Sequence, residues 1–66
     1  MTILINGELE THSRQTTAQD ILKQRCGDQN KGVAIAKNGS ILHRDKWNIP
    51  LNDGDELEII VASQGG

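Results

Sequence analysis

The pattern of apolar and polar residues predicts strands in both halves of this chain and one helix between them. Residues 2–6 are rich in β-branched side chains and predict a first strand. Asn6-Gly7 then predicts a hairpin turn, because a type I′ turn requires a positive φ at both central residues. Residues 8–12 alternate between charged or polar and apolar side chains, which predicts a half-exposed return strand.

The next segment carries the signals of one short helix. Thr17 and Asp20 stand at the N-cap and N3 positions of a capping box, and Thr16 with Gln19 is an alternative register one residue earlier. Gly27 is the expected C′ residue. A helix of about ten residues is not stable alone, so it must pack on a sheet. Four residues form its apolar face: Ala18, Ile21, Leu22 and Cys26.

The second half of the chain predicts three more strands. Residues 33–37 are apolar on both faces, which indicates an interior strand. Asn38-Gly39 is a second turn signal, and residues 40–43 form a short fourth strand. The last strand covers residues 56–62, with Leu57, Ile59 and Val61 on one face. A helical turn at 44–49 and a turn at 52–55 complete the predicted elements.

This order of elements predicts an α+β fold. The right-handed crossover rule makes the first strand a parallel neighbour of a later one. Placing the last strand beside the first puts two apolar strands at the centre of the sheet. The expected architecture is the β-grasp (ubiquitin-like) fold, a mixed sheet of four to five strands packed on one helix. We expect the β-grasp domain to cover residues 1–62, followed by a flexible C-terminal Gly-Gly tail at 63–66.

The tail combines features that suit transfer to another protein. Five residues beyond Val61 reach roughly 16 Å when fully extended. Gly65 and Gly66 have no Cβ, so they fit a slot too narrow for a side chain. A C-terminal carboxyl is ionised at neutral pH, since its reference pKa is about 3.5. A slim anionic end handed to a partner is one interpretation, and a frayed terminus is the other.

Composition narrows the class of protein. With 66 residues the chain makes one small domain, without room for a deep catalytic pocket. The formal charge of −2 and the scattered Lys and Arg residues argue against a nucleic-acid partner. The single cysteine, Cys26, excludes an internal disulfide and fits a reducing compartment. No signal peptide or apolar run of membrane-spanning length is present, so we expect a cytoplasmic domain without a membrane partner.

Several reactive side chains have structural interpretations. Cys26 is expected to be an inert core thiol because of its helical spacing. His12 and His43 lack further ligands at metal-binding spacing, so no metal site is predicted. Trp47 is expected to cover an edge of the sheet, and an exposed partner contact is the alternative. The acidic residues of the strands and turns are expected to be solvated: Glu8, Glu10, Asp53, Asp55 and Glu58.

Short motifs are spread over nearly the whole chain, at 3–8, 17–22, 34–39, Arg44 with Trp47, Leu51, Gly54-Asp55 and Gly65-Gly66. Together they resemble the ThiS family of small sulfur carriers in thiamin biosynthesis. Each motif alone is weak, but their order, spacing and placement at the chain end together indicate this family. His43 departs from it, because the family often has proline before the arginine. Ser63 and Gln64 fall in a region that varies within the family.

The resemblance implies a protein cosubstrate rather than an enzyme. It implies that a ThiF-like adenylating enzyme uses ATP and Mg²⁺ to join the Gly66 carboxylate to AMP. A sulfur donor enzyme would then supply sulfur for a Gly66 thiocarboxylate, and a ThiG-like thiazole synthase would accept that sulfur. Gly65 would fit the tail into the partner's channel. The chain itself carries no phosphate-binding loop and no carboxylates at metal-binding spacing, so no bound cofactor is expected.

Three alternatives remain at this point. The small sulfur-carrier subunit of molybdopterin synthase shares the fold and the tail, but those chains are usually longer and richer in phenylalanine, which is absent here. A ubiquitin-like protein modifier would attach Gly66 to lysines. A plain interaction domain would have an inert tail. In each case the apolar sheet face away from the helix is a plausible docking surface, because one helix covers only one face.

Overall fold

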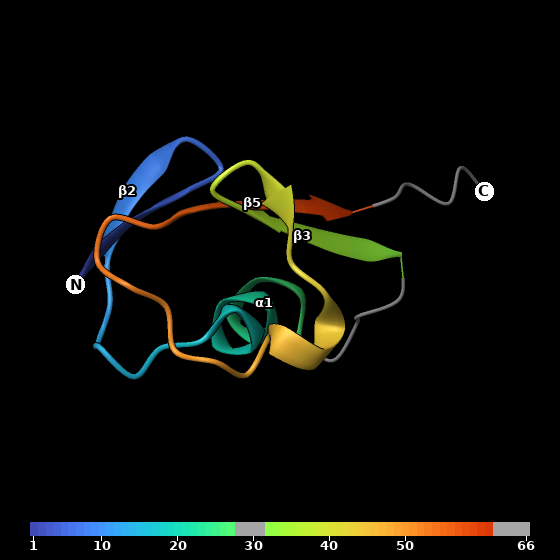
Figure 1. Ribbon diagram of the computed structural model, residues 1–66, viewed down its shortest axis with the longest axis horizontal. Helices are drawn as coiled ribbons and strands as arrows, with labels where there is room; N and C mark the ends of the chain where they lie inside the picture. The colour runs from blue at the N-terminus through green and yellow to red at the C-terminus, as the bar shows by residue number, and fades with distance from the viewer. Residues whose placement is uncertain (28–31, 62–66) are drawn as a thin grey trace.

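Five strands and one α-helix lie in two layers in the computed structural model, which describes residues 1–27 and 32–61. The sheet has the order β2-β1-β5-β3-β4 and α1 packs against one of its faces (Figure 1). β1 pairs in parallel with β5, and the other strand pairs are antiparallel. The elements are β1 (Thr2–Ile5), β2 (Glu8–Thr11), α1 (Ala18–Cys26), β3 (Val33–Lys37), β4 (Ser40–Ile41), a 3₁₀ helix η1 (Arg44–Lys46) and β5 (Glu56–Val61).

This arrangement confirms the predicted β-grasp fold, with the first and last strands side by side at the centre. Both Asn-Gly pairs form the predicted turns. Asn6 and Gly7 have φ values of 50° and 86°, and Asn38 and Gly39 have values of 53° and 86°. Positive φ at both central residues is what a type I′ hairpin requires. Each turn therefore joins two neighbouring antiparallel strands directly.

The helix begins in the predicted register. The Asp20 amide donates to Thr17 Oγ1 over 3.1 Å, and the Thr17 amide donates to Asp20 Oδ2 over 3.0 Å. These reciprocal bonds form the capping box at Thr17, so the alternative start at Thr16 is wrong. At the other end, the Gly27 amide donates to the Lys23 carbonyl and Gly27 has a φ of 63°. Gly27 therefore ends the helix as predicted.

The core lies between α1 and the sheet. Side chains from one face of β1, β3 and β5 meet the apolar face of the helix there, and the segment after β4 closes the side of this layer. Cys26 is half-buried and packs against this core. No helix of the described residues is long and apolar enough to span a membrane. The buried residues are Ile3, Ile5, Ala18, Ile21, Leu22, Ile35, Trp47, Leu51 and Leu57.

Trp47 belongs to this core rather than to a docking surface. Its side chain is 4% exposed, and its indole N–H donates to the Leu42 carbonyl over 2.9 Å. The Arg44 guanidinium lies 5.1 Å from the ring centroid, at a distance typical of a cation–π contact. The alternative of an exposed partner contact at Trp47 is therefore wrong.

The fourth strand is shorter than the sequence predicts. β4 covers only Ser40 and Ile41, although the Leu42 amide still donates to the Ile35 carbonyl. The chain then turns into η1, and the Leu42 carbonyl accepts the indole N–H of Trp47. β3 is an interior strand, as predicted. β4 pairs only with the C-terminal end of β3, at Ala36 and Lys37. The burial of Trp47, which strand periodicity does not encode, decides where β4 stops.

Candidate functional site

The predicted site residues Gly65 and Gly66 lie outside the described residues, as do Ser63 and Gln64. The same holds for the proposed boundary between residues 62 and 63, which stays a prediction. The structure does describe the strand that leads to this segment. We call its last three residues, Ile59 to Val61, the β5 exit.

One side of β5 is fixed along its whole length by β3. The register pairs Val33 with Val61 at one end and Lys37 with Leu57 at the other. The Asn38 side chain extends this contact beyond β3, because Asn38 Oδ1 accepts the Glu56 amide over 2.9 Å. The Asn38 amide in turn donates to the Glu56 carbonyl. The β5 exit is therefore held in place on its β3 side.

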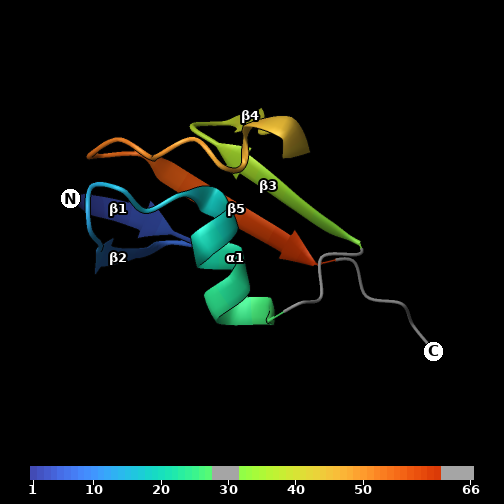
Figure 2. The same cartoon turned by 90° about the horizontal axis from the view of Figure 1, so that it is seen from below.

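The other side of β5 is paired only at its start. β1 runs beside Glu56 and Leu57, and the chain then turns away at Asn6. The Asn6 amide donates to the Leu57 carbonyl over 3.0 Å, and Asn6 Oδ1 accepts the Ile59 amide over 2.8 Å. Figure 2 shows β5 continuing well past the end of β1 with β3 beside it. Asn6 is thus the last described contact on this side of β5.

Exposure rises along β5 as the strand leaves the core. Leu57 is 0% exposed, whereas Val61 on the same face is 57% exposed. Ile60 on the opposite face is 53% exposed. Two large apolar side chains therefore flank the backbone at the β5 exit, one on each face of the sheet.

The sheet face away from α1 carries further exposed apolar residues. Leu9 on β2 is 74% exposed and Ile41 on β4 is 61% exposed. Side chains alternate along a strand, so Ile60 and its partner Ala34 lie on this face, together with Glu58. The docking surface predicted from the sequence stays a prediction, and the structure adds that its apolar residues are spread over four strands.

In the turn before β5, the prediction of solvated acidic residues is wrong for Asp55 and confirmed for Asp53. Asp55 is buried, with 7% of its surface exposed. Its Oδ2 accepts the Asn52 amide over 2.8 Å, and its Oδ1 accepts the Asn38 side-chain amide over 3.1 Å. Asp53 is exposed, and its Oδ1 accepts the Thr2 amide over 2.7 Å. Carboxylates here fix where β5 begins, because each satisfies backbone or amide donors of neighbouring segments.

Sequence reasoning missed the roles of Asn6 and Asn38. Both were interpreted only as turn residues, but each carboxamide also bonds to the backbone of β5. The sequence did contain a signal for these roles. An Asn-Gly pair follows β1 and another follows β3, and these are the two strands beside β5. Together these two asparagines orient the strand that leads to the predicted site.

A charged cluster joins β2 to the helix. Glu10 lies 2.9 Å from His12 Nε2 and also forms an ion pair with Arg25 at the end of α1. The hydrogen bond from His12 and then that from Arg25 hold the pKa of the Glu10 carboxyl below its usual value. Because Glu10 contacts both His12 and Arg25, Glu10 and His12 support the packing of β2 on α1.

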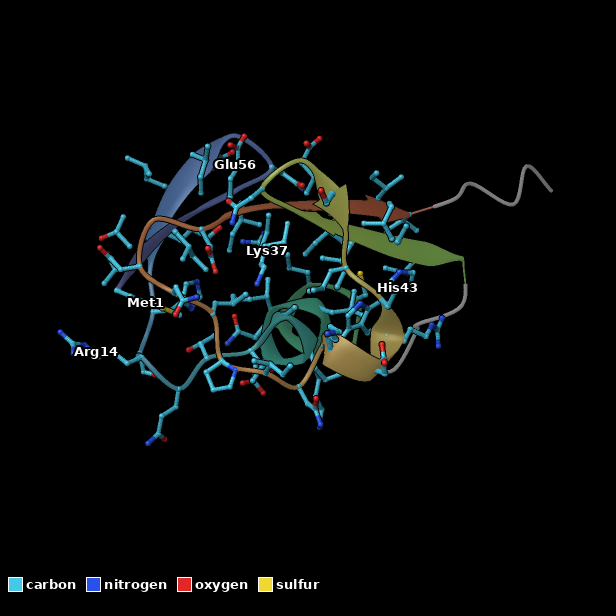
Figure 3. All side chains as sticks on the ribbon, in the orientation of Figure 1. Met1, Arg14, Lys37, His43 and Glu56 are labelled. Atoms are coloured by element: carbon cyan, nitrogen blue, oxygen red, sulfur yellow. The ribbon has the colours of Figure 1, made fainter. Side chains whose placement is uncertain are left out.

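In Figure 3, Met1 and Arg14 lie at one end of the molecule, whereas His43 lies towards the end where β5 finishes.

Within the described residues, no three His, Cys, Asp or Glu side chains lie close enough to hold a metal ion. That part of the chain also forms no pocket. Cys26 is half-buried at the end of α1, where its side chain packs on the core.

Comparison with known proteins gives a consistent set of matches. The sequence model described as the ThiS family matches residues 3–66. The chain is also similar to the crystal structure of the thiamine biosynthesis protein ThiS from Geobacter metallireducens. The TM-score is 0.77 and the sequence identity is 25%, over 100% of both chains.

A curated relative places a similar segment in a longer protein. The thiazole synthase of Paramagnetospirillum magneticum is 34% identical to this chain over 67 residues. The match covers 100% of this chain but only 20% of that protein. The chain thus spans about a fifth of the length of this relative.

Proposed function

Because the chain belongs to the ThiS family, we propose that it is a sulfur carrier of thiamin biosynthesis whose reactive group is the carboxylate of Gly66. The observation that carries this proposal is the extent of the family match. It runs from residue 3 to residue 66, so it includes the β-grasp domain and the final Gly65-Gly66 pair. The agreement with the ThiS structure over both complete chains supports the same conclusion.

The first proposed step activates the carboxylate. An adenylating enzyme of the ThiF type binds ATP and Mg²⁺, and a Gly66 oxygen attacks the α-phosphorus of ATP. A bond forms between that oxygen and phosphorus, and pyrophosphate leaves. Activation is needed because a carboxylate repels nucleophiles and oxide is a poor leaving group. The resulting acyl adenylate carries AMP as its leaving group.

The second proposed step exchanges oxygen for sulfur. A sulfur nucleophile at the oxidation level of hydrosulfide, supplied through a sulfur donor enzyme, attacks the acyl carbon and displaces AMP. The product is a thiocarboxylate at Gly66, a stronger sulfur nucleophile than any side chain of this protein. Thiazole synthase then accepts the sulfur for thiazole formation. In this scheme the chain is a cosubstrate that partner enzymes act upon.

The described structure suits such a role in one respect. β5 is fixed by β3, by β1 and by the Asn6 and Asn38 side chains. Its last residue, Val61, is five positions before Gly66 in the sequence. A partner that binds the folded domain therefore meets the reactive group at a limited distance, roughly 18 Å at most from Val61. Such positioning lowers the entropic cost of bringing the reacting atoms together.

The test is a reconstitution followed by mass spectrometry. We expect the chain, incubated with its adenylating enzyme, ATP, Mg²⁺ and a sulfur source, to gain the mass of one oxygen-to-sulfur exchange. Fragment spectra should place that exchange at Gly66. The chain alone should show no turnover. Exchange at Cys26 instead of Gly66 would overturn the proposal.

The acceptor assay separates this proposal from the two related functions. Thiocarboxylated chain should support thiazole formation by thiazole synthase. Sulfur transfer only to a molybdopterin precursor would favour the molybdopterin synthase subunit. Covalent ladders of the chain on other proteins in denaturing gels would favour a protein modifier.

A further inference from the structure

The β5 exit has one sheet edge that no described strand covers. On the β3 side, pairing continues to Val61. On the β1 side, strand pairing ends at Leu57, and the Asn6 carboxamide takes only the Ile59 amide. Beyond Asn6 the chain turns into the β1–β2 hairpin. An unpaired strand edge of this kind is a template for another strand.

The hydrogen-bond pattern identifies the atoms that face this open edge. The Glu56 amide and carbonyl both bond to Asn38, so even-numbered residues of β5 bond towards β3. The Leu57 carbonyl and the Ile59 amide bond to Asn6, so odd-numbered residues bond towards β1. Alternation therefore directs the Ile59 carbonyl and the Val61 amide to the open edge.

These two groups form the repeating unit of a parallel ladder. Asn6 makes the same pair of bonds two residues earlier along β5. Its backbone amide donates to the Leu57 carbonyl, and its side-chain oxygen accepts from the Ile59 amide. One residue of an added parallel strand would donate to the Ile59 carbonyl and accept from the Val61 amide in the same way. The added strand would thus continue the line of β1 past the point where β1 ends.

The surroundings leave this edge accessible in the described part of the chain. α1 lies in the other layer, below the sheet in Figure 1, and not beside β5 in the plane of the sheet. Ile60 and Val61 are 53% and 57% exposed. A strand added here would cover apolar surface on both faces of the sheet while it paired the backbone.

We propose that this open edge binds an extended segment of thiazole synthase, which adds a parallel strand beside Ile59 to Val61. Two observations select this occupant. β5 is the strand that runs directly into residues 62–66, so a contact here also positions the reactive end of the chain. In addition, the thiazole synthase of Paramagnetospirillum magneticum carries a segment similar to this chain within one polypeptide. The inference rests on the proposed function.

The outer edge of β2 is a weaker alternative for the same partner. Its only large apolar side chain is Leu9, and the acidic Glu8 and Glu10 stand on either side of it. Charged side chains on an edge strand discourage pairing with another strand. Glu10 is moreover engaged by His12 and Arg25. The β5 exit lacks such charges, because it consists of Ile59, Ile60 and Val61.

Amide hydrogen exchange of the wild-type chain tests the proposal without any substitution. In the free chain the Ile60 amide, which bonds towards β3, should exchange more slowly than the Val61 amide. With saturating thiazole synthase from the same organism, exchange at Val61 should slow at least about tenfold, as expected for a newly formed ladder bond. Unchanged exchange at Val61 in the saturated complex would overturn the proposal.

A pair of variants separates the backbone from the side chain. Val61→Pro removes the amide that faces the open edge and leaves the bonds to β3 in place. Val61→Thr keeps that amide and the β-branched shape. We expect the proline variant to bind thiazole synthase at least about tenfold more weakly than the threonine variant, with both still folded. Equal affinities would overturn the proposal, and the wild-type exchange measurement decides if Val61→Pro fails to fold.

Failure of this inference is distinguishable from failure of the proposed function. If the wild-type chain forms the Gly66 thiocarboxylate and supports thiazole formation while Val61 stays unprotected in the complex, only the edge contact is wrong. If no thiocarboxylate forms with the adenylating enzyme, the proposed function itself is wrong. If the chain does not bind thiazole synthase at all, the edge contact is overturned whatever the thiocarboxylate assay shows.

Discussion

Cys26 is the only thiol of a chain proposed to carry sulfur, and its surroundings favour a structural role. It is half-buried at the end of α1 and packs against the core, four residues after the buried Leu22. Cys26→Ser should reduce the free energy of unfolding by about 1 kcal/mol, because a hydroxyl replaces a thiol at a partly apolar site. Urea denaturation measures this cost.

The same variant should form the Gly66 thiocarboxylate at the wild-type rate, as measured by mass spectrometry after incubation with the adenylating enzyme. Gln24→Ala on the solvent face of the same helix is a suitable control for stability, since that residue is exposed. A folded Cys26→Ser variant that formed no thiocarboxylate would contradict the structural role and place Cys26 in the chemistry.

Glu10 makes stability depend on pH through its two hydrogen-bond partners. His12 and Arg25 hold the pKa of Glu10 below its ordinary value of 4.5 in the folded chain. A carboxyl with a lowered folded-state pKa adds stability that is present above the unfolded-state value. This stability is lost as the pH falls through the folded-state pKa.

Glu10→Gln should therefore be less stable than the wild type at pH 5.5, and the difference should shrink steadily as the pH falls below about 4.5. Thermal unfolding of both proteins between pH 3 and pH 6 measures this difference. Glu8→Gln, on the same strand and exposed, is the matched control. A difference that stayed constant over this range would show that the Glu10 ion pairs do not contribute through its ionisation.

At the scale of elements, the turn before β5 depends on one buried carboxylate. Asp55→Ala would leave the Asn52 amide and the Asn38 side chain without their acceptor in a site that is 7% exposed. The expected loss is about 2–3 kcal/mol, because unsatisfied buried donors keep their desolvation cost. Urea denaturation of Asp55→Ala and Asp53→Ala measures the contrast.

Asp53→Ala removes a single exposed hydrogen bond, from the Thr2 amide, and should cost less than about 1 kcal/mol. Similar losses for the two variants would mean that burial of Asp55 does not set its contribution. The comparison is informative because both carboxylates belong to one turn and each accepts at least one backbone amide.

The elements that sequence predicts well are those specified by neighbouring residues. The Asn-Gly turns, the capping box of Thr17 with Asp20, and the stop at Gly27 each depend on residues within one turn, and all are confirmed. The central pairing of β1 with β5 followed from handedness and apolar pattern. These predictions needed no knowledge of which distant side chains meet.

The errors arise where distant residues decide. Asp55 has the local pattern of a solvated turn residue, but the Asn38 side chain from the β3–β4 turn reaches it and completes its burial. β4 ends early because Trp47 enters the core and its indole N–H bonds to Leu42. Neither contact can be predicted from turn residues or from strand periodicity. The sequence alone therefore predicted a longer β4 and an exposed Asp55 carboxylate.

At the scale of the whole molecule, the protein combines a fixed domain with a short segment proposed to react. The order β2-β1-β5-β3-β4 places β5 between two neighbours and directs its end away from the N-terminus (Figure 2). Gly65 and Gly66 stay predicted site residues, and the family match includes both of them. The domain and the reactive end should therefore respond separately to substitution.

Gly65 provides the sharpest test of this separation. If the end of the chain enters a narrow channel in each partner, a side chain at residue 65 would meet the channel walls and displace the Gly66 carboxyl. A displacement of about 1 Å can reduce a rate roughly a hundredfold. Gly65→Leu should therefore keep the wild-type melting temperature while thiocarboxylate formation or sulfur delivery falls steeply. Gly65→Ala should lie between the two.

Melting and single-turnover thiocarboxylate formation are to be measured on the same samples, and any thiocarboxylate formed is then passed to thiazole synthase. Deletion of Gly66 serves as the control for the reactive group, since it should abolish transfer with the fold intact. A Gly65→Leu variant with a lowered melting temperature would mean that residue 65 contributes to the domain. Normal rates of thiocarboxylate formation and of sulfur delivery for Gly65→Leu would show that neither partner binds residue 65 in a narrow channel. The tail would then act only as a tether for the Gly66 carboxyl, and the contacts that orient it would have to come from the folded domain.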